Sequence, residues 1–172
     1  LIKAERVASH GGSLRGVVQH KDGPHAVDGS VSARVEHEAE IGLYEAATLQ
    51  QLGLKIFRVG TELMALLKSM KASGKRIAGF GAPAKATTLM YQFDMGPDMI
   101  DFIVDDSPLK QDLFSPGMHI PVLPSEALYS KRPDAVVVLA WNFAEAIIKK
   151  NAAFVEQGGQ FIVPLPNVRI VG

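Results

Sequence analysis

The sequence predicts an α/β fold in which an open, mainly parallel sheet of the doubly wound kind carries helices on both faces. After Gly74 the chain alternates short apolar runs with helical segments, and this order forms parallel sheets through helical crossovers. The apolar runs are nearly continuous, as expected for strands that are covered on both faces. We expect a long helix, and before it an extension of strand and helix, to precede this sheet.

The extension is expected over residues 1–48. A strand is expected at residues 14–20, followed by a polar, turn-rich loop and a helix through residues 33–46 that Ser30 or Ser32 caps. The sequence has no initiator Met and begins almost at once with an apparent strand. This start suggests a piece of a longer protein, to whose other part the extension would join the domain.

A long helix is expected over residues 49–73, because apolar residues recur there at steps of three and four. They are Leu49, Leu52, Ile56, Val59, Leu63, Leu66 and Met70. Gly53 and Gly60 interrupt this helix, each at a cost of about 1 kcal/mol unless close packing uses it, and Gly74 is a natural C-terminal stop. We expect the apolar face to pack on its own domain; the alternative is a dimer seam in a non-enzymatic assembly module.

The α/β domain itself is expected over residues 74–172. Its strands are expected at residues 75–80, 99–104, 134–141 and 158–163, with further extended segments at 119–123 and 167–171. Its helices are expected at residues 83–93, 124–130 and 142–157. Pro83 opens the first of these helices, where its missing N–H does no harm.

Composition excludes several classes of function. The 18 basic and 18 acidic residues balance, which argues against a general nucleic-acid surface. No apolar run approaches the roughly 20 residues needed to cross a bilayer, and no signal peptide is recognisable, so a cytoplasmic setting is expected. The chain has no cysteine, which excludes disulfides, thiolate zinc sites and cysteine nucleophiles.

The first loop of the α/β domain, residues 79–85, has the sequence GFGAPAK and matches the G-x-G-x-x-A form of the dinucleotide fingerprint through Gly79, Gly81 and Ala84. Such glycines let the backbone approach a phosphate, which the first N–H groups of the next helix receive. Lys85 lies in that first turn, where a cation is mildly unfavourable unless an anion is bound. The alternative is a tight strand-to-helix turn with a surface lysine.

The second loop follows the strand at residues 99–104. In open α/β sheets ligands bind beyond the carboxyl ends of the strands, where an acid such as Asp105 or Asp106 holds the ribose of a nicotinamide cofactor. Both acids are equally explained as caps of the turn that begins at Ser107. Lys110 and Gln111 either hold a second polar group of the same ligand or lie in solvent.

The third loop places Asn142 beside Trp141, a pair that suits a base or a sugar, although Asn142 also suits a helix cap. His119 enters a fourth loop region and is a candidate for the same cleft. His37 lies between two glutamates, but neighbours one apart on a helix point in different directions. No metal-ligand spacing and no Ser-His-Asp arrangement is recognisable, so no catalytic residue and no metal ligand are assigned.

Four segments together resemble one protein family. They are HGGSLR, GFGAPAKATTL, VDDSPLKQDLFSPGMHIPV and VVVLAWNFAEAI, beginning at residues 10, 79, 104 and 136. They resemble the C-terminal domain of S-adenosylmethionine-dependent C-methyltransferases, which include enzymes that methylate a carbon of nucleotide-linked deoxysugars. The segments are long and in order, and the resemblance extends from His10 to about Val171.

The resemblance implies a parent enzyme of three parts. A cysteine-rich module binds zinc, a middle domain binds S-adenosylmethionine, and a C-terminal Rossmann-like domain helps to hold a nucleotide-diphosphate sugar or related small molecule. This chain matches the third part only. S-adenosylmethionine is therefore expected outside it, no cofactor is expected within it, and the fragment is expected to be inactive alone.

Ligand-holding roles are what the resemblance implies for the matching residues. The diphosphate would be cradled by Gly79, Gly81, Ala82, Pro83 and Lys85. The remaining walls would be lined by Asp105, Asp106, Ser107, Lys110, Gln111 and Asn142. His10 through Arg15 would join the domain to the catalytic part, with Ser13 or Arg15 reaching the shared cleft.

A different class of function stays open beside this one. The fingerprint and Asp105 also suit the nicotinamide-binding domain of an oxidoreductase. Lys85 in the turn and the absence of a catalytic Tyr-x-x-x-Lys motif count against it.

Overall fold

The computed structural model describes all of residues 1–172. The chain divides into two units, residues 1–55 and residues 56–172, and the division lies inside the longest helix, α2 (Ala46–Ala72). Each unit is described here by itself. None of the helices combines the length and the apolar character that crossing a membrane requires.

The first unit is a β-hairpin followed by a helix. Strands β1 (Lys3–Val7) and β2 (Ser13–Val17) pair antiparallel, and the 3-10 turn η1 (Ser9–Gly11) lies between them. Helix α1 (Ser30–Glu40) contacts β1 through the main-chain N–H of Ala4, which donates to the Ser30 hydroxyl at 3.0 Å. Ala4 is the only buried residue of this unit, so the unit has almost no core of its own.

Helix α1 is earlier and shorter than expected. Gly29 is the N-cap, and the carboxylate of Asp28 before it accepts the N–H of Ser30 at 2.7 Å, so Ser30 lies inside the helix and does not cap it. The expected continuation to residue 46 is wrong, because the chain turns at Gly42, where φ is +67°. Helix α2 then begins at Ala46, three residues before the expected start.

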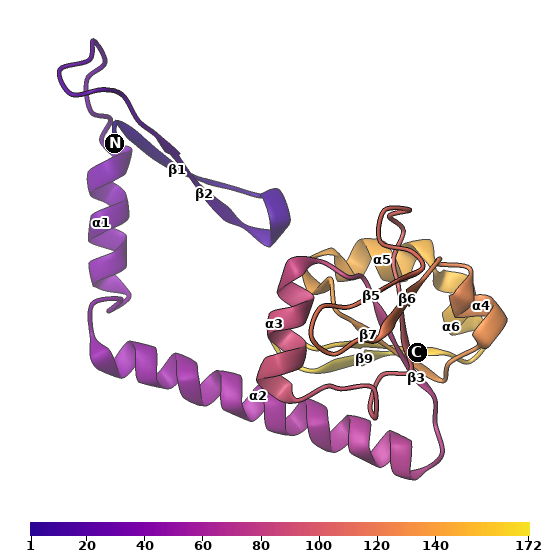
Figure 1. Cartoon of the computed structure of the whole chain (residues 1–172). Helices are drawn as coiled ribbons and strands as arrows, with labels where there is room; N and C mark the ends of the chain where they lie inside the picture. The colour runs from indigo at the N-terminus through magenta and orange to yellow at the C-terminus, as the bar shows by residue number, and fades with distance from the viewer. The chain divides into compact units, whose positions relative to one another are not determined.

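The second unit contains a seven-stranded sheet in the order β5-β6-β4-β3-β7-β8-β9 (Figure 1). Its strands are β3 (Ile77–Phe80), β4 (Phe102–Val104), β5 (Leu113–Phe114), β6 (Pro121–Leu123), β7 (Ala135–Val138), β8 (Gln160–Val163) and β9 (Arg169–Val171). The five inner strands are parallel, and the outer β5 and β9 are antiparallel to their neighbours. The expected mainly parallel α/β fold is confirmed. The short edge strand β5 was not expected.

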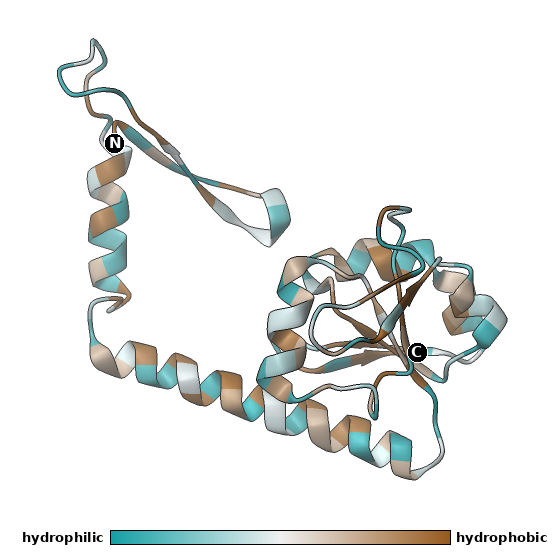
Figure 2. Cartoon of the chain, viewed as in Figure 1, coloured by the Kyte–Doolittle hydropathy of each residue, from teal (hydrophilic) through white to brown (hydrophobic).

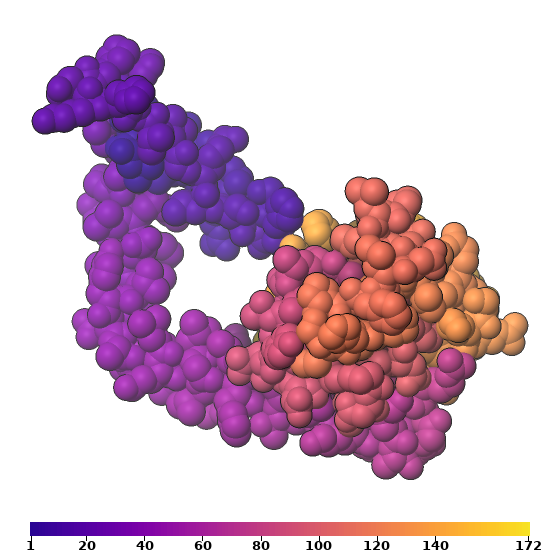
Figure 3. All heavy atoms as spheres, viewed as in Figure 1, coloured from indigo at the N-terminus to yellow at the C-terminus, as the bar shows by residue number.

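Helices cover both faces of this sheet. Side chains from one face form a core with α2 and α3 (Ala84–Phe93), and side chains from the other face form a core with α4 (Ala127–Lys131), α5 (Ala144–Lys150) and α6 (Ala152–Glu156). Successive strand residues alternate between the two cores, as Ile77 and Ala78 do. The inner strands are accordingly apolar along their length (Figure 2), and the space-filling view shows the unit as one packed mass (Figure 3).

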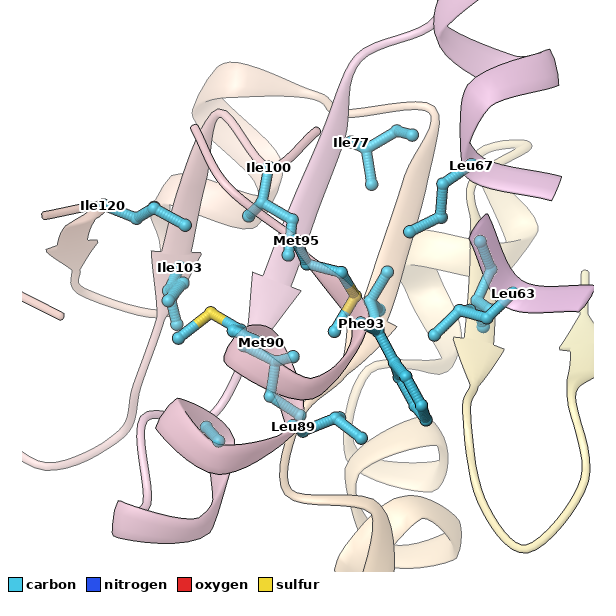
Figure 4. Close-up of a cluster of buried hydrophobic side chains, with 14 of the residues drawn as sticks. Leu63, Leu67, Ile77, Leu89, Met90, Phe93, Met95, Ile100, Ile103 and Ile120 are labelled. Carbon is cyan, nitrogen blue, oxygen red and sulfur yellow. The ribbon is translucent and has the colours of Figure 1, made fainter. Parts of the chain in front are cut away.

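The apolar face of α2 is buried in the C-terminal half of the helix and exposed in the N-terminal half. Its C-terminal half contributes Val59, Leu63, Leu67 and Met70 to the core. In Figure 4 Leu67 lies beside Ile77 and Leu63 lies beside Phe93, all in one buried cluster. A Cβ on Gly60 would lie 2.6 Å from the Phe93 ring, so this glycine allows α2 to approach α3. In the N-terminal half Leu49 and Leu52 are each 54% exposed.

The single helix expected over residues 142–157 is wrong. It is replaced by a 3-10 turn, η2 (Trp141–Phe143), and by α5 and α6, which are interrupted at Asn151. Asn151 is buried, donates to the carbonyl of Ile147 at 2.9 Å and accepts from the Tyr129 hydroxyl at 3.2 Å. A buried carboxamide must find partners, and here the Ile147 carbonyl and the Tyr129 hydroxyl supply them where α5 ends.

Candidate ligand site at the carboxyl edge of the sheet

Three loops meet where β4, β3 and β7 end, because these strands are parallel neighbours. The loop after β3 contains Ala82 and Lys85, the loop after β4 begins at Asp105, and the loop after β7 contains Asn142. Two side-chain contacts connect them: Asp105 to Ala82 and Lys85 to Asn142. The chain also changes direction here, since it adds β4 and β6 on one side of β3 and then β7 and β8 on the other. Ligands of open α/β sheets bind at such a point.

The glycines of the first loop are needed by the packing of the loop itself. Gly81 has φ +89°, a value that favours glycine, and a Cβ there would lie 2.6 Å from the Cβ of Ala140. A Cβ on Gly79 would lie 2.8 Å from the Leu139 side chain. Leu139 and Ala140, directly after β7, therefore pack against the two glycines. This packing accounts for glycine at both positions without a bound phosphate.

Asp105 is buried and fixes the loop after β3 to the loop after β4. Its carboxylate accepts the main-chain N–H of Ala82 at 2.6 Å and that of Ser107 at 2.8 Å. The Lys110 ammonium lies 3.2 Å from the same carboxylate. Gln111 donates to the main-chain carbonyl of Asp105 at 3.0 Å. The Ala82 amide, expected to receive phosphate, is thus bonded to a carboxylate in this structure.

Lys85 reaches from the first turn of α3 to the loop after β7. Its ammonium donates to the side-chain carbonyl of Asn142 and lies 4.7 Å from the centre of the Trp141 ring and 5.6 Å from that of Phe143. Burial lowers the pKa of Lys85 below its ordinary value of 10.5. An ammonium over aromatic faces is attracted by the rings, and it brings a positive charge to the middle of the edge.

Two hollows open at this edge. One, which we call the α3 pocket, has a volume of about 300 Å³. It is lined mainly by apolar side chains, among them Ala82, Pro83, Met90, Phe114 and Val122, with Lys110, Thr87 and Ser115. The other, which we call the β8 pocket, has a volume of about 500 Å³. It is lined by Trp141, Asn142, Phe143, Glu145, Leu165, Pro166, Asn167 and Arg169, among others.

Residues 8–166 match the model of the C-methyltransferase C-terminal domain family. The chain belongs to this family. It is also 34% identical, over 162 residues, to a protein described as C-methyltransferase NovU from Streptomyces niveus. That match covers 94% of this chain and 39% of the relative, so the chain spans about two fifths of the relative's length. The resemblance found in the sequence is confirmed.

Two further candidates, Asp106 and His119, line neither hollow of this C-methyltransferase C-terminal domain. Asp106 points away from Asp105: its carboxylate accepts from the Ser125 hydroxyl at 2.6 Å and pairs with Lys150 at 2.8 Å. These hydrogen bonds, first that from Lys150, lower the pKa of Asp106. His119 is exposed, has φ +51°, and places Nδ1 3.0 Å from the carbonyl of Gly117. It does not line the α3 pocket.

The remaining candidates belong to the first unit of the C-methyltransferase C-terminal domain. His10 lies in η1 with φ +54°, and the Ser13 hydroxyl donates to the carbonyl of Ser9 at 3.0 Å. Arg15 forms an ion pair with Glu5 across the hairpin. These contacts shape the hairpin, and a ligand-binding role for the three residues stays a prediction.

Sequence reasoning missed most of the β8 pocket in this domain. Phe143, Asn167 and Arg169 line it, and none of them was a candidate. The signal was present: residues 164–168 follow a strand parallel to β7, and the carboxyl ends of parallel strands carry the sites. No group of three His, Asp or Glu side chains is arranged to hold a metal ion.

Proposed function

We propose that this domain binds the nucleoside diphosphate part of a sugar nucleotide for a S-adenosylmethionine-dependent C-methyltransferase. Family membership supports a role in C-methylation, and the length of the relative leaves room for a catalytic part outside this chain. The inner strand order β6-β4-β3-β7-β8 supports the Rossmann-like assignment, because it is the doubly wound order of nucleotide-binding sheets. Nucleotides bind to such sheets at the edge that carries the two hollows.

The observation that carries the proposal is the position of Lys85. Its ammonium lies against Asn142, Trp141 and Phe143, which line the β8 pocket, and its two neighbours in the chain, Ala84 and Ala86, line the α3 pocket. A diphosphate beside it would gain a charge-assisted contact, strengthened because the ammonium is partly desolvated. Asp105 places a carboxylate on the Ala82 amide, so we assign the diphosphate to Lys85 rather than to that amide.

The role of the domain in the reaction would be to position the acceptor. S-adenosylmethionine would supply the methyl group and would be bound by the catalytic part of the parent enzyme. There a base removes a proton next to a keto group, and the resulting carbanion attacks the sulfonium methyl. Holding the acceptor in place supplies much of the acceleration of a two-substrate reaction. No residue of this chain is assigned to the proton transfer.

The nicotinamide-binding alternative is disfavoured by Asp105. In a dinucleotide-binding sheet the acid at this position holds ribose hydroxyls. Here its carboxylate is buried and bonded to Ala82, Ser107 and Lys110. A ribose would have to break these bonds.

Calorimetry of the 172-residue chain with UDP, dTDP and NADH tests the proposal. We expect UDP or dTDP to bind, and Lys85→Glu to weaken that binding at least tenfold. Lys68→Glu is the matched control, because Lys68 is exposed on α2 and the net charge changes equally. Binding of NADH without any response to UDP or dTDP would overturn the proposal.

A further inference from the structure

The β8 pocket combines flat aromatic surface with carboxamides. Trp141 and Phe143 come from η2, and Asn167 comes from the loop after β8. Phe143 is 48% exposed although it is a large apolar side chain. Aromatic faces stack on nucleobases, and carboxamides donate to and accept from the base edges.

The α3 pocket is less suited to a base. It is smaller and mainly apolar, and two of its polar groups are already bonded. The Lys110 ammonium pairs with Asp105, and the Ser115 hydroxyl accepts the main-chain N–H of Ile120 at 3.0 Å. A base placed there would lose its hydrogen bonds to water without replacement, which costs free energy.

The charges around the β8 pocket distinguish its two ends. Arg169 on β9 pairs with Glu145 on α5, so the charges of this wall offset each other. Lys85 lies against Trp141 and Phe143 and has no acidic partner among its contacts. An anion is therefore favoured at the Lys85 end, and a neutral group fits the end near Asn167.

We propose that the β8 pocket holds the nucleobase, with Phe143 and Trp141 against its face and Asn167 bonded to its edge, while Lys85 binds the diphosphate. This inference rests on the proposed function and adds which residues select a nucleotide over an inorganic anion. The sugar that carries the reacting carbon then extends from the diphosphate away from the β8 pocket.

The test compares UDP with inorganic pyrophosphate on the whole chain. Trp141 is the only tryptophan, so its fluorescence reports directly on the pocket. We expect UDP to quench it, because a base stacked on an indole does so. Asn167→Ala and Phe143→Ala should each weaken UDP about tenfold, the size of one stacked or paired base, and Asn167→Ala should leave pyrophosphate affinity unchanged.

Two controls complete the design. Gln157→Ala removes an exposed carboxamide beside Gly158, in a different hollow, and should change neither affinity. Lys85→Met should weaken both ligands. UDP affinity that is unchanged in both Asn167→Ala and Phe143→Ala would overturn the base pocket while the proposed function stands. Failure of the wild-type chain to bind UDP or dTDP would overturn the proposed function and this inference with it.

Discussion

The carboxylate of Asp105 and the main-chain N–H of Ala82 are 2.6 Å apart and form a hydrogen bond across two loops that are 23 residues apart in sequence. Asp105, directly after β4, therefore holds the turn after β3 in place. The turn keeps its shape without a ligand, and the anion it was expected to hold is replaced by a side chain of the protein.

Replacing Asp105 by Asn should destabilise the second unit by about 2–3 kcal/mol. The substitution removes the charge from bonds to two main-chain amides and to Lys110, and bonds to charged groups are worth about 1.5–3 kcal/mol. Urea denaturation measures the loss. The control is Asp94→Asn, because Asp94 is exposed at a left-handed position that Asn also adopts. Equal stability of the two variants would contradict the bracing role.

Two glycines of α2 should respond oppositely to alanine. At Gly53 the added methyl meets no atom within 4 Å, so helix propensity should raise stability by about 0.5–1 kcal/mol. At Gly60 the methyl would lie 2.6 Å from the buried Phe93 ring, and such overpacking costs about 1–3 kcal/mol. Thermal unfolding of both variants provides the comparison. A stabilised Gly60→Ala variant would show that the two helices can separate freely.

Binding of UDP should weaken as the pH rises, and it should do so below the pKa of an ordinary lysine. Burial lowers the pKa of Lys85 from 10.5, so its ammonium loses its proton earlier as the solution becomes alkaline. The phosphate groups of UDP are fully ionised well before this, since their second pKa is about 6.

Calorimetric titrations between about pH 7.5 and 9 measure the effect, in a range where ordinary lysines stay charged. Lys85→Arg is the control, because a guanidinium keeps its charge throughout. A wild-type affinity that is as constant over this range as that of the arginine variant would contradict a lowered pKa of Lys85.

Asp106 should contribute stability only above acidic pH. Its pKa in the folded protein is lowered from 3.8 by hydrogen bonds from Lys150 and Ser125. The contribution is therefore fully present above 3.8 and is lost as the pH falls through the lowered value. Asp106→Asn should cost about 0.5 kcal/mol near neutral pH, the size of an exposed ion pair. Denaturation curves in acid should converge for the two proteins, and a gap that widened there would have the wrong sign.

The fold was largely predictable because its strands are buried on both faces. Runs such as Val136 to Leu139 are apolar at every position, and both faces of the sheet are covered by helices. Helix ends were harder to predict, since single polar contacts decide them. The Asp28 carboxylate bonds to Ser30, which is the first residue of α1 and not its cap. The buried carboxamide of Asn151 lies between α5 and α6, where one helix was expected.

The candidate site was predictable as a place but not as a set of contacts. Strand order brings Lys85 and Asn142 together although they are 57 residues apart, and the position of the loops follows from the fold. The use of each side chain does not, because Asp105 fits a ribose or a main-chain amide equally well in sequence. Asn167 and Arg169 were missed because the segment after β8, the fifth inner strand in sequence, carries no recognisable motif in its loop or in β9.

The two outer strands of the sheet have a consequence for self-association. Both run against their neighbours and are short, with two residues in β5 and three in β9. An intruding chain needs a long, flat row of unpaired amides and carbonyls to extend a sheet. Neither edge of the seven-stranded sheet offers one, so this sheet is protected against fibril-like stacking through its edges.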